Sequence, residues 1–271
     1  GWCACHCEHR GLGRTFGFDM KLGIHQPYFF PYFGYFHNIQ AADEFVLCDQ
    51  VQFAKGGWVD RNQLRANTPT GSTYIRPQLT KPSGSKFLIE ELRLSPDDRW
   101  RKKLLKFIWH AYKNAQFVDE VYPFIQDLIA YQPEKLSEFN FHSVKAVCEF
   151  LGITTRLHFN APELEEVERE LDALTEAYNE SMPIHRRQVR VIEFCKRKGM
   201  DTYINTIGGQ ELYDRESFAA HGLGLEFVKS HPIEYVQFEG KPFVPYLSII
   251  DVLMHTGAQG ARAFLDDFSM V

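Results

Sequence analysis

Long apolar runs are missing from this chain of 271 residues, and so is an excess of positive charge. No segment approaches the roughly 18 apolar residues that a membrane-spanning helix needs, because Pro, Asp or His interrupts each apolar stretch. The sequence therefore predicts no membrane insertion. The formal net charge of -5 does not supply the broad positive field with which general nucleic-acid binders neutralise phosphates. We therefore expect no nucleic-acid partner.

Paired cysteines are also missing from most of the chain. Cys48, Cys148 and Cys195 have neither disulfide nor metal-ligand spacing. We interpret them as buried thiols, which fits a reducing compartment and predicts a cytoplasmic location. No metal site is predicted from these residues.

Residues 1–19 differ in composition from the rest and precede Met20. Cysteine occupies every second position from Cys3 to Cys7, and His6 and His9 lie beside it. A zinc site normally spaces its paired cysteines by two to four residues and has a second pair, which is missing here. We therefore interpret residues 1–19 as a leader or translated upstream sequence, and residues 20–271 as a single α/β domain.

Strand-like and helix-like segments alternate along this domain, which is typical of a mainly parallel sheet covered by helices. A helical subdomain is expected over about 95–152, where three segments show an apolar stripe at helical spacing. The charged segment 163–180 is either a surface helix or a mobile excursion. Strands are expected at 21–24, 44–53, 73–79, 86–94, 153–159, 201–207 and 223–230.

The first predicted strand runs directly into His25 and Gln26. At the carboxyl edge of a parallel sheet, where ligands bind in open α/β folds, an imidazole and an amide would be exposed to a substrate. His25 is a candidate acid or base. The alternative is a hydrogen-bonded ring that steers the turn before Pro27.

A second group of polar residues follows the next predicted strand. A carboxylate, amides, the two guanidinia of Arg61 and Arg65 and an indole in one loop suit recognition of a phosphorylated or nucleotide-linked sugar, because arginine grips phosphate and tryptophan stacks on a base or a sugar. The alternative is a loop joined by Asp–Arg ion pairs. The predicted binding residues here are Asp49, Gln52, Trp58, Arg61 and Asn62.

A strand, a Gly-Gly turn and a helix are expected around Asn205, Gly208 and Gly209. Backbone N–H groups at such a turn can receive an anion, although two glycines equally fit a tight turn. Arg187, in the basic start of the preceding helix, is a further phosphate-binding candidate or part of a solvated face.

Near the end of the chain, Ser248, Asp251 and His255 share one face of an expected short helix that Gly257 ends. Asp251 is the second acid or base candidate, paired with His255. Ser248 is a substrate contact or a helix cap, and Tyr246 a substrate contact. A Ser-His-Asp triad is not expected, because one helix cannot align three such side chains in series.

Six landmarks follow one another along the chain: HQPYFFPYFGY, LCDQVQFAKGGWVDRNQLR, the segments around Trp100 and Arg187, TYINTIGGQELYD and FVPYLSIIDVLMHTG. In this order they resemble the WbqC-like family of bacterial proteins over essentially all of residues 20–271. The resemblance implies a role in the biosynthesis of lipopolysaccharide O-antigen and related surface-polysaccharide sugars. It implies a pathway rather than a reaction.

The favoured hypothesis is a transferase that moves an acyl or related group to an amino sugar or a nucleotide-linked sugar, with His25 and Asp251 in acid–base roles. One alternative is a nucleotidylyl-transferase-like enzyme, in which a helix start after the first strand receives phosphate. The other is a non-catalytic binding or scaffold protein of the same pathway. The sequence identifies no cofactor, although Asp49 or Asp251 could hold Mg²⁺ beside a nucleotide.

Overall fold

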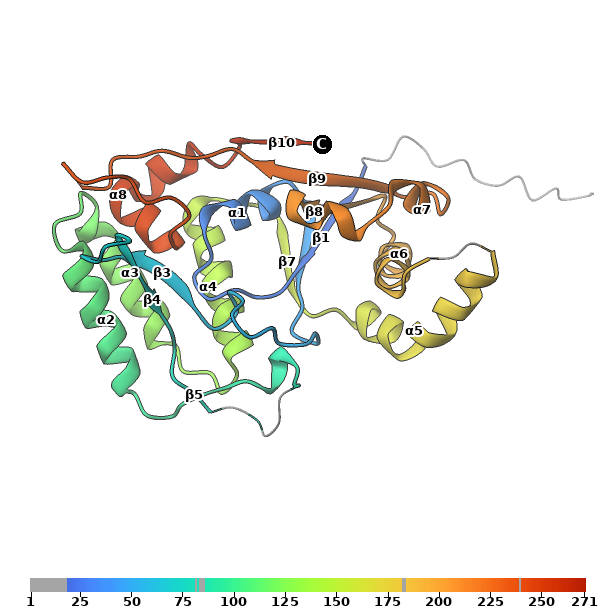
Figure 1. Ribbon diagram of the computed structural model, residues 1–271, viewed down its shortest axis with the longest axis horizontal. Helices are drawn as coiled ribbons and strands as arrows, with labels where there is room; N and C mark the ends of the chain where they lie inside the picture. Colours follow the sequence, from blue (N-terminus) through green and yellow to red (C-terminus); the bar gives the residue numbers. More distant parts are fainter. Residues whose placement is uncertain (1–18, 81, 83–85, 182–183, 239) are drawn as a thin grey trace, which may run out of the picture.

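A six-stranded sheet runs through the middle of the molecule in the computed structural model, which describes residues 19–80, 82, 86–181, 184–238 and 240–271 (Figure 1). Its strands, in spatial order, are β10 (Phe268–Met270), β9 (Gly224–Ser230), β8 (Thr202–Thr206), β1 (Lys21–His25), β2 (Glu44–Leu47) and β7 (Arg156–Phe159). All neighbours are parallel except β10, which runs antiparallel to β9. The expected α/β fold with a mainly parallel sheet is confirmed.

The strand order reverses at β1. The chain adds β2 and then β7 on one side of β1, and β8 and then β9 on the other. This is the doubly wound arrangement, in which the connections after the two central strands leave toward opposite faces and open a crevice at the carboxyl edge.

Helices cover both faces of this sheet. One face carries α1 (Phe33–Gln40), α4 (Leu136–Leu151) and α8 (Ile249–Arg262), together with α2 (Arg99–Tyr112) and α3 (Val118–Ala130). The other face carries α5 (Pro162–Ser181), α6 (Arg186–Lys198) and α7 (Arg215–Ala219). The short elements are the hairpin of β3 (Asn62–Arg65) and β4 (Ser72–Ile75), the pair β5 (Leu79–Thr80) and β6 (Arg93–Leu94), and the 3₁₀ turns η1 (Ile89–Glu91) and η2 (Ile207–Leu212).

The sequence of β2 shows why both faces are covered. Side chains alternate across a strand, so Phe45 and Leu47 pack on the side of α1 and α4, whereas Val46 packs on the side of α5 and α6. All three are fully buried, which makes β2 apolar on both faces. Such a strand fits only the interior of a layered α/β sheet.

The segment predicted as a helical subdomain forms α2, α3 and α4. Their apolar stripes join the same buried cluster as the sheet residue Phe45, and α3 and α4 both contact α8. Residues 95–152 therefore extend the main core rather than forming a core of their own. The charged segment 163–180 forms the helix α5, one of the two outcomes left open by the sequence.

Four strand predictions are corrected. Residues 86–94 form η1 and the two-residue β6, because the N–H of Ile89 bonds to the carbonyl of Val51 and the chain then turns at once. The predicted strand 73–79 is divided into β4 and β5. The predicted strand 44–53 ends at Leu47, and the one at 153–159 begins at Arg156.

Three features complete the comparison with the sequence. Gly257 has φ +63° and kinks α8, which then continues to Arg262, so the predicted helix end is an internal break. Cys48, Cys148 and Cys195 are free and buried, as predicted. Within the described part of the chain, no helix has the length and apolar character needed to cross a bilayer. The cysteines and histidines before Met20 lie outside the described residues.

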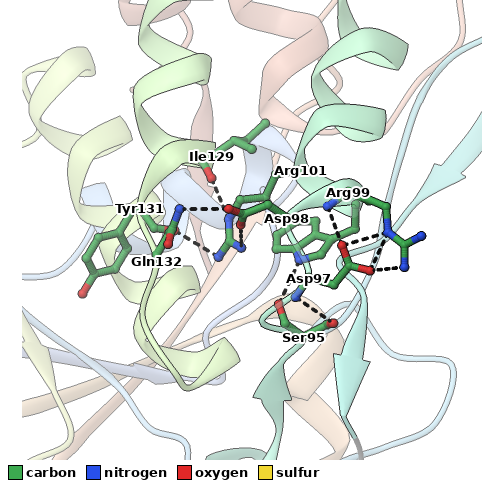
Figure 2. Close-up of polar contacts among 9 residues, drawn as sticks. Ser95, Asp97, Asp98, Arg99, Arg101, Ile129, Tyr131 and Gln132 are labelled. Atoms are coloured by element: carbon green, nitrogen blue, oxygen red, sulfur yellow. Dashed lines mark hydrogen bonds and ion pairs between the residues drawn. The ribbon is translucent and has the colours of Figure 1, made fainter.

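A buried arginine fixes the start of α2 to the end of α3 (Figure 2). Arg101 donates from Nε to the carbonyl of Ile129 (3.0 Å) and from Nη2 to that of Tyr131 (3.3 Å), and its Nη1 pairs with Asp98 at 3.0 Å. Carbonyl groups at a helix end lack intrahelical partners, so these bonds satisfy acceptors that would otherwise remain unpaired. Only 8% of the Arg101 side chain is exposed.

We expect the substitution Arg101→Met to lower the free energy of unfolding by about 1–3 kcal/mol, because it leaves buried carbonyl groups without a donor. Urea unfolding followed by circular dichroism measures this change. Arg99→Met is the matched control, since the Arg99 side chain is 82% exposed and its ion pair with Asp97 lies in solvent. Equal losses in the two variants would contradict the assigned role of Arg101.

Candidate functional site

A cavity of about 380 Å³ opens at the carboxyl edge of the sheet, where the strand order reverses. His25 and Gln26 reach it from the end of β1, and Asn205 and Thr206 from the end of β8. These two strands are direct neighbours. Ligands of doubly wound folds bind at this position, so the cavity is the candidate active site.

A hydrogen bond fixes the tautomer of His25. Its Nδ1 lies 3.1 Å from the carbonyl oxygen of Gln26, which also accepts a bond of 2.8 Å from the Tyr35 hydroxyl. Because a carbonyl oxygen can only accept, Nδ1 must carry the proton. The lone pair of His25 is therefore on Nε2, which bonds to no other residue in the described chain.

The surroundings of His25 keep its imidazole neutral. The ring is half-buried and meets Tyr28 and Tyr35 edge to face, with centroids 4.7 and 5.0 Å away. Burial lowers the pKa of His25, and the bond to Gln26 offsets this only in part. Burial also raises the pKa of Tyr28 to about 12, so its hydroxyl remains protonated. His25 can thus act as a base at neutral pH.

Asn205 lines the same cavity as His25, from the neighbouring strand. Its Oδ1 accepts the N–H of Thr206 at 2.8 Å, which leaves Nδ2 as a free donor. A Cβ at Gly209 would lie 2.6 Å from that Nδ2, so the position of the amide requires glycine there. Gly208 has open space instead. Both glycines line the cavity, within η2 rather than before a long helix as expected.

The far wall of the cavity comes from α5 and α6 and carries one uncompensated positive charge. Arg190 and Glu168 neutralise each other, with Arg190 Nη2 donating to Glu168 at 3.1 Å. Arg187 is exposed, and no acceptor contacts its guanidinium among the residues that the structure describes. An anionic group of a ligand can therefore pair with Arg187 without breaking an existing ion pair.

The sequence missed several residues of this wall. Glu168, Arg190 and the aromatic residues Tyr203 and Tyr213 line the cavity, but no local pattern connects them to β1. Tyr203 looked like an ordinary apolar position of a strand. The only usable signal was the basic start of α6, which pointed to Arg187.

Asp49 does not reach the cavity. Its carboxylate accepts the Ser137 hydroxyl at 2.6 Å and the Asn160 amide at 2.9 Å, and the residue is 1% exposed. These bonds tie the end of β2 to α4 and to the end of β7. Neither the predicted substrate contact nor the alternative Asp–Arg pair describes it.

The rest of the loop after β2 lies apart as well. Arg61 bonds to the carbonyl of Gly57 at 3.2 Å and stacks over Tyr74 at 4.6 Å and Trp58 at 5.8 Å. Asn62 donates to the carbonyls of Phe29 and Phe30 at 3.2 and 2.8 Å. Gln52 is exposed in a neighbouring hollow that shares Arg187 with the cavity. Of this predicted group, only Gln52 lies close enough to extend the candidate site.

The structure also separates Asp251 from His25. Asp251 is fully buried in α8, where Oδ1 accepts the Tyr112 hydroxyl at 2.7 Å, and Oδ2 accepts the Tyr235 hydroxyl at 2.6 Å and the Gln237 amide at 2.9 Å. His255 Nε2 lies 3.9 Å from Oδ1, beyond hydrogen-bond distance. Asp251 therefore organises its own network instead of lining the cavity.

Ser248 and Tyr246 lie beside that network. Ser248 caps α8 by accepting the N–H of Ile250 at 3.3 Å, and it donates to the carbonyl of Phe30 at 2.8 Å. The cap was one of the two expected roles. Tyr246 has φ +58°, is 72% exposed and lines a second cavity, of about 230 Å³.

The N-terminus of the first helix after β1 does not line the cavity around His25, although Tyr35 of that helix packs against the imidazole. α1 begins at Phe33, and Tyr32, Phe33 and Gly34 line the second cavity. A nucleotidylyl-transferase arrangement needs this helix start beside the histidine, where it receives phosphate. The cavity around His25 therefore lacks that element.

The chain matches the sequence profile of the WbqC-like protein family over residues 26–263. The chain belongs to this family. This WbqC-like protein is also 25% identical over 240 residues to "Uncharacterized protein Rv1507c" of Mycobacterium tuberculosis (strain ATCC 25618 / H37Rv), in an alignment covering 88% of this chain and 95% of the relative. No solved structure matches it.

We expect the imidazole of His25 to titrate below its ordinary pKa of 6.5, because burial disfavours the charged form. Carbon–proton NMR of the ring, assigned from the signal lost in His25→Gln, measures the midpoint. Just below pH 6.5 the imidazole of His25 is therefore protonated to a greater extent in the unfolded chain than in the folded one. The contribution of His25 to the free energy of unfolding decreases as the pH falls below 6.5. A midpoint at or above the ordinary value would contradict the neutral ring.

Proposed function

We propose that this WbqC-like protein is an enzyme of surface-polysaccharide sugar biosynthesis that transfers an acyl or related group to an amino sugar or a nucleotide-linked sugar. The observation that carries the enzymatic part is the neutral His25, with its free Nε2 on the wall of a cavity at the reversal of strand order. The pathway part rests on what the family implies. The cytoplasmic location remains a prediction.

His25 has the properties of a general base for such a transfer. As the amine or hydroxyl of the acceptor attacks the carbonyl carbon of the donor, Nε2 takes its proton, and the same proton can then pass to the leaving group. The bond from Nδ1 to Gln26 holds the ring in the required tautomer before and after this step. The Tyr28 hydroxyl and the Asn205 amide are donors within the same cavity.

The charge and the walls of the cavity support an anionic sugar derivative. Arg187 offers an unpaired guanidinium, which binds phosphate with two parallel hydrogen bonds. Tyr213 is half-buried on the cavity wall and provides an aromatic surface against which a sugar or base ring can pack. Asp251 has no part in this scheme, because its carboxylate is buried among three donors elsewhere.

Thermal unfolding in the presence of amino sugars, nucleotide-linked sugars, acyl donors and nucleotides with Mg²⁺ tests the proposal. A ligand of the cavity at about one hundred times its Kd should stabilise the protein by roughly 2.7 kcal/mol. We expect a nucleotide-linked or phosphorylated sugar to do so. The shift should shrink in Arg187→Gln and remain in Arg197→Gln, a control at the other end of α6 whose arginine pairs with Glu170.

Once a substrate pair is identified, His25→Gln should lower kcat by roughly 10²–10⁴-fold while the sugar still binds, because general-base catalysis typically contributes that much. Unchanged turnover in this variant would refute the assigned base. Binding without turnover by the wild-type protein would favour the scaffold alternative. Binding of a nucleoside triphosphate with Mg²⁺ that depends on His25 would favour nucleotidylyl transfer.

A further inference from the structure

Arg65 is a buried cation whose side chain has no hydrogen-bond partner among the residues that the structure describes. Only 9% of the residue is exposed, and Nη1 is fully buried with no acceptor among the described residues. No described carboxylate forms an ion pair with it. A guanidinium has five N–H donors and keeps its charge at every physiological pH. Burying it unpaired is unfavourable, so an acceptor is missing from this position.

Arg65 lines a cavity of about 720 Å³ that does not include His25. One wall is the turn between β3 and β4, another is the end of α2, and the third is formed by Phe238 and residues 241–244. Gly71 brings the turn close to the arginine, because a Cβ there would lie 3.2 Å from Arg65 Nη1 and 2.8 Å from Val244 Cγ2. Its φ of +72° also favours glycine.

The described lining of this cavity carries no acidic side chain. Lys241 adds a second cation, and His110 adds an imidazole at the rim. Both are exposed and pair with no described residue. The Asn67 amide of the turn provides a further donor, whereas the hydroxyls of Thr68 and Thr70 already donate to the carbonyl of Ser72. Phe238, Pro242 and Val244 provide an apolar surface. The cavity therefore combines a positive end with an apolar wall.

Asp251 does not fill the missing position. Its two oxygens already accept bonds from Tyr112, Tyr235 and Gln237, and none comes from the Arg65 side chain. The backbone N–H of Arg65 bonds to the Tyr112 hydroxyl at 3.1 Å. This bond holds the arginine beside the Asp251 network and leaves its guanidinium available to the cavity.

We propose that this cavity is a second ligand site, which binds a small molecule with a carboxylate or phosphate head group. Arg65 grips the head group with parallel N–H bonds, Lys241 adds charge, and the apolar part of the ligand lies against Phe238 and Val244. Carboxylate and phosphate both present two adjacent oxygen atoms, which can accept two parallel N–H bonds from one guanidinium. The ligand supplies the acceptor that Arg65 lacks.

The second site is independent of the cavity around His25. The two share no lining residue. In Figure 1, β3, β4 and α2 lie toward one end of the molecule, and α5 and α6 toward the other. Failure of the proposed transferase function would therefore leave this inference standing, and the reverse is also true.

Isothermal titration of the full chain with benzoate and with phenyl phosphate tests the site, and benzyl alcohol serves as the neutral probe. We expect at least one of the two anions to bind at millimolar concentration or below and benzyl alcohol to bind much more weakly. The stronger of the two anions identifies the head group. Binding should be unchanged in His25→Gln.

Two substitutions locate the binding. Arg65→Lys keeps the charge but loses the paired N–H geometry, so the Kd should rise roughly tenfold or more. Lys241→Gln should raise it roughly two- to fivefold. Lys229→Gln is the matched control, an exposed lysine on β9 outside the cavity. Circular dichroism checks the fold of each variant, and Lys241→Gln decides alone if Arg65→Lys does not fold.

Three results would overturn the proposal: neither anion binds the wild-type protein, the neutral probe binds as tightly as the anions, or Lys241→Gln binds no more weakly than Lys229→Gln. A crystal structure with phenyl phosphate bound at Arg65 would support it directly. The same compound bound only at Arg187 would overturn it.

Discussion

The chain adds β2 and β7 on one side of β1, and then β8 and β9 on the other side. The connections after β1 and β8 must therefore leave toward opposite faces of the sheet. α1 follows β1 onto one face, and η2 and α7 follow β8 onto the other. No backbone then covers the gap between the two strand ends. The positions of His25, Gln26 and Asn205 all follow from this divergence, which a single-sided sheet would not produce.

The sequence predicted the candidate site best where polar residues lie directly at the end of a strand. His25 and Gln26 lie at the end of β1, and Asn205 lies at the end of β8. An apolar strand pattern followed by polar residues was enough to predict that these side chains meet at one edge of the sheet. Arg187 could be anticipated from the basic start of α6. Glu168 and Tyr213 could not, because their place on the cavity wall depends on how α5 and η2 pack across the sheet.

The polar residues of the chain were harder to interpret than the apolar ones. Asp49 and Asp251 looked like functional carboxylates, yet each accepts two or three hydrogen bonds from distant segments. A buried carboxylate of this kind needs hydrogen-bond donors, and these come from elements far away in the sequence. The sequence around the carboxylate therefore does not reveal its structural role. Arg65 shows the opposite case, since only the structure reveals that its donors have no acceptor.

The Asp251 network has a dynamic consequence for the long connection between β9 and α8. The described residues of this connection, 231–238 and 240–248, form no helix or strand. Tyr235 and Gln237 attach its first part to Asp251, and Gln237 bonds both the N–H and the carbonyl of Val244 in the second part. The ends of the connection are also bonded to the fold, since the N–H of His231 bonds to Asp267 and that of Ser248 bonds to Gln63. Between these ends, the part held through the Asp251 carboxylate should open as a cooperative unit, with its amide protons exchanging together rather than one by one. Because Phe238, Lys241 and Val244 belong to that unit, occupation of the cavity beside Arg65 would slow exchange across the whole connection.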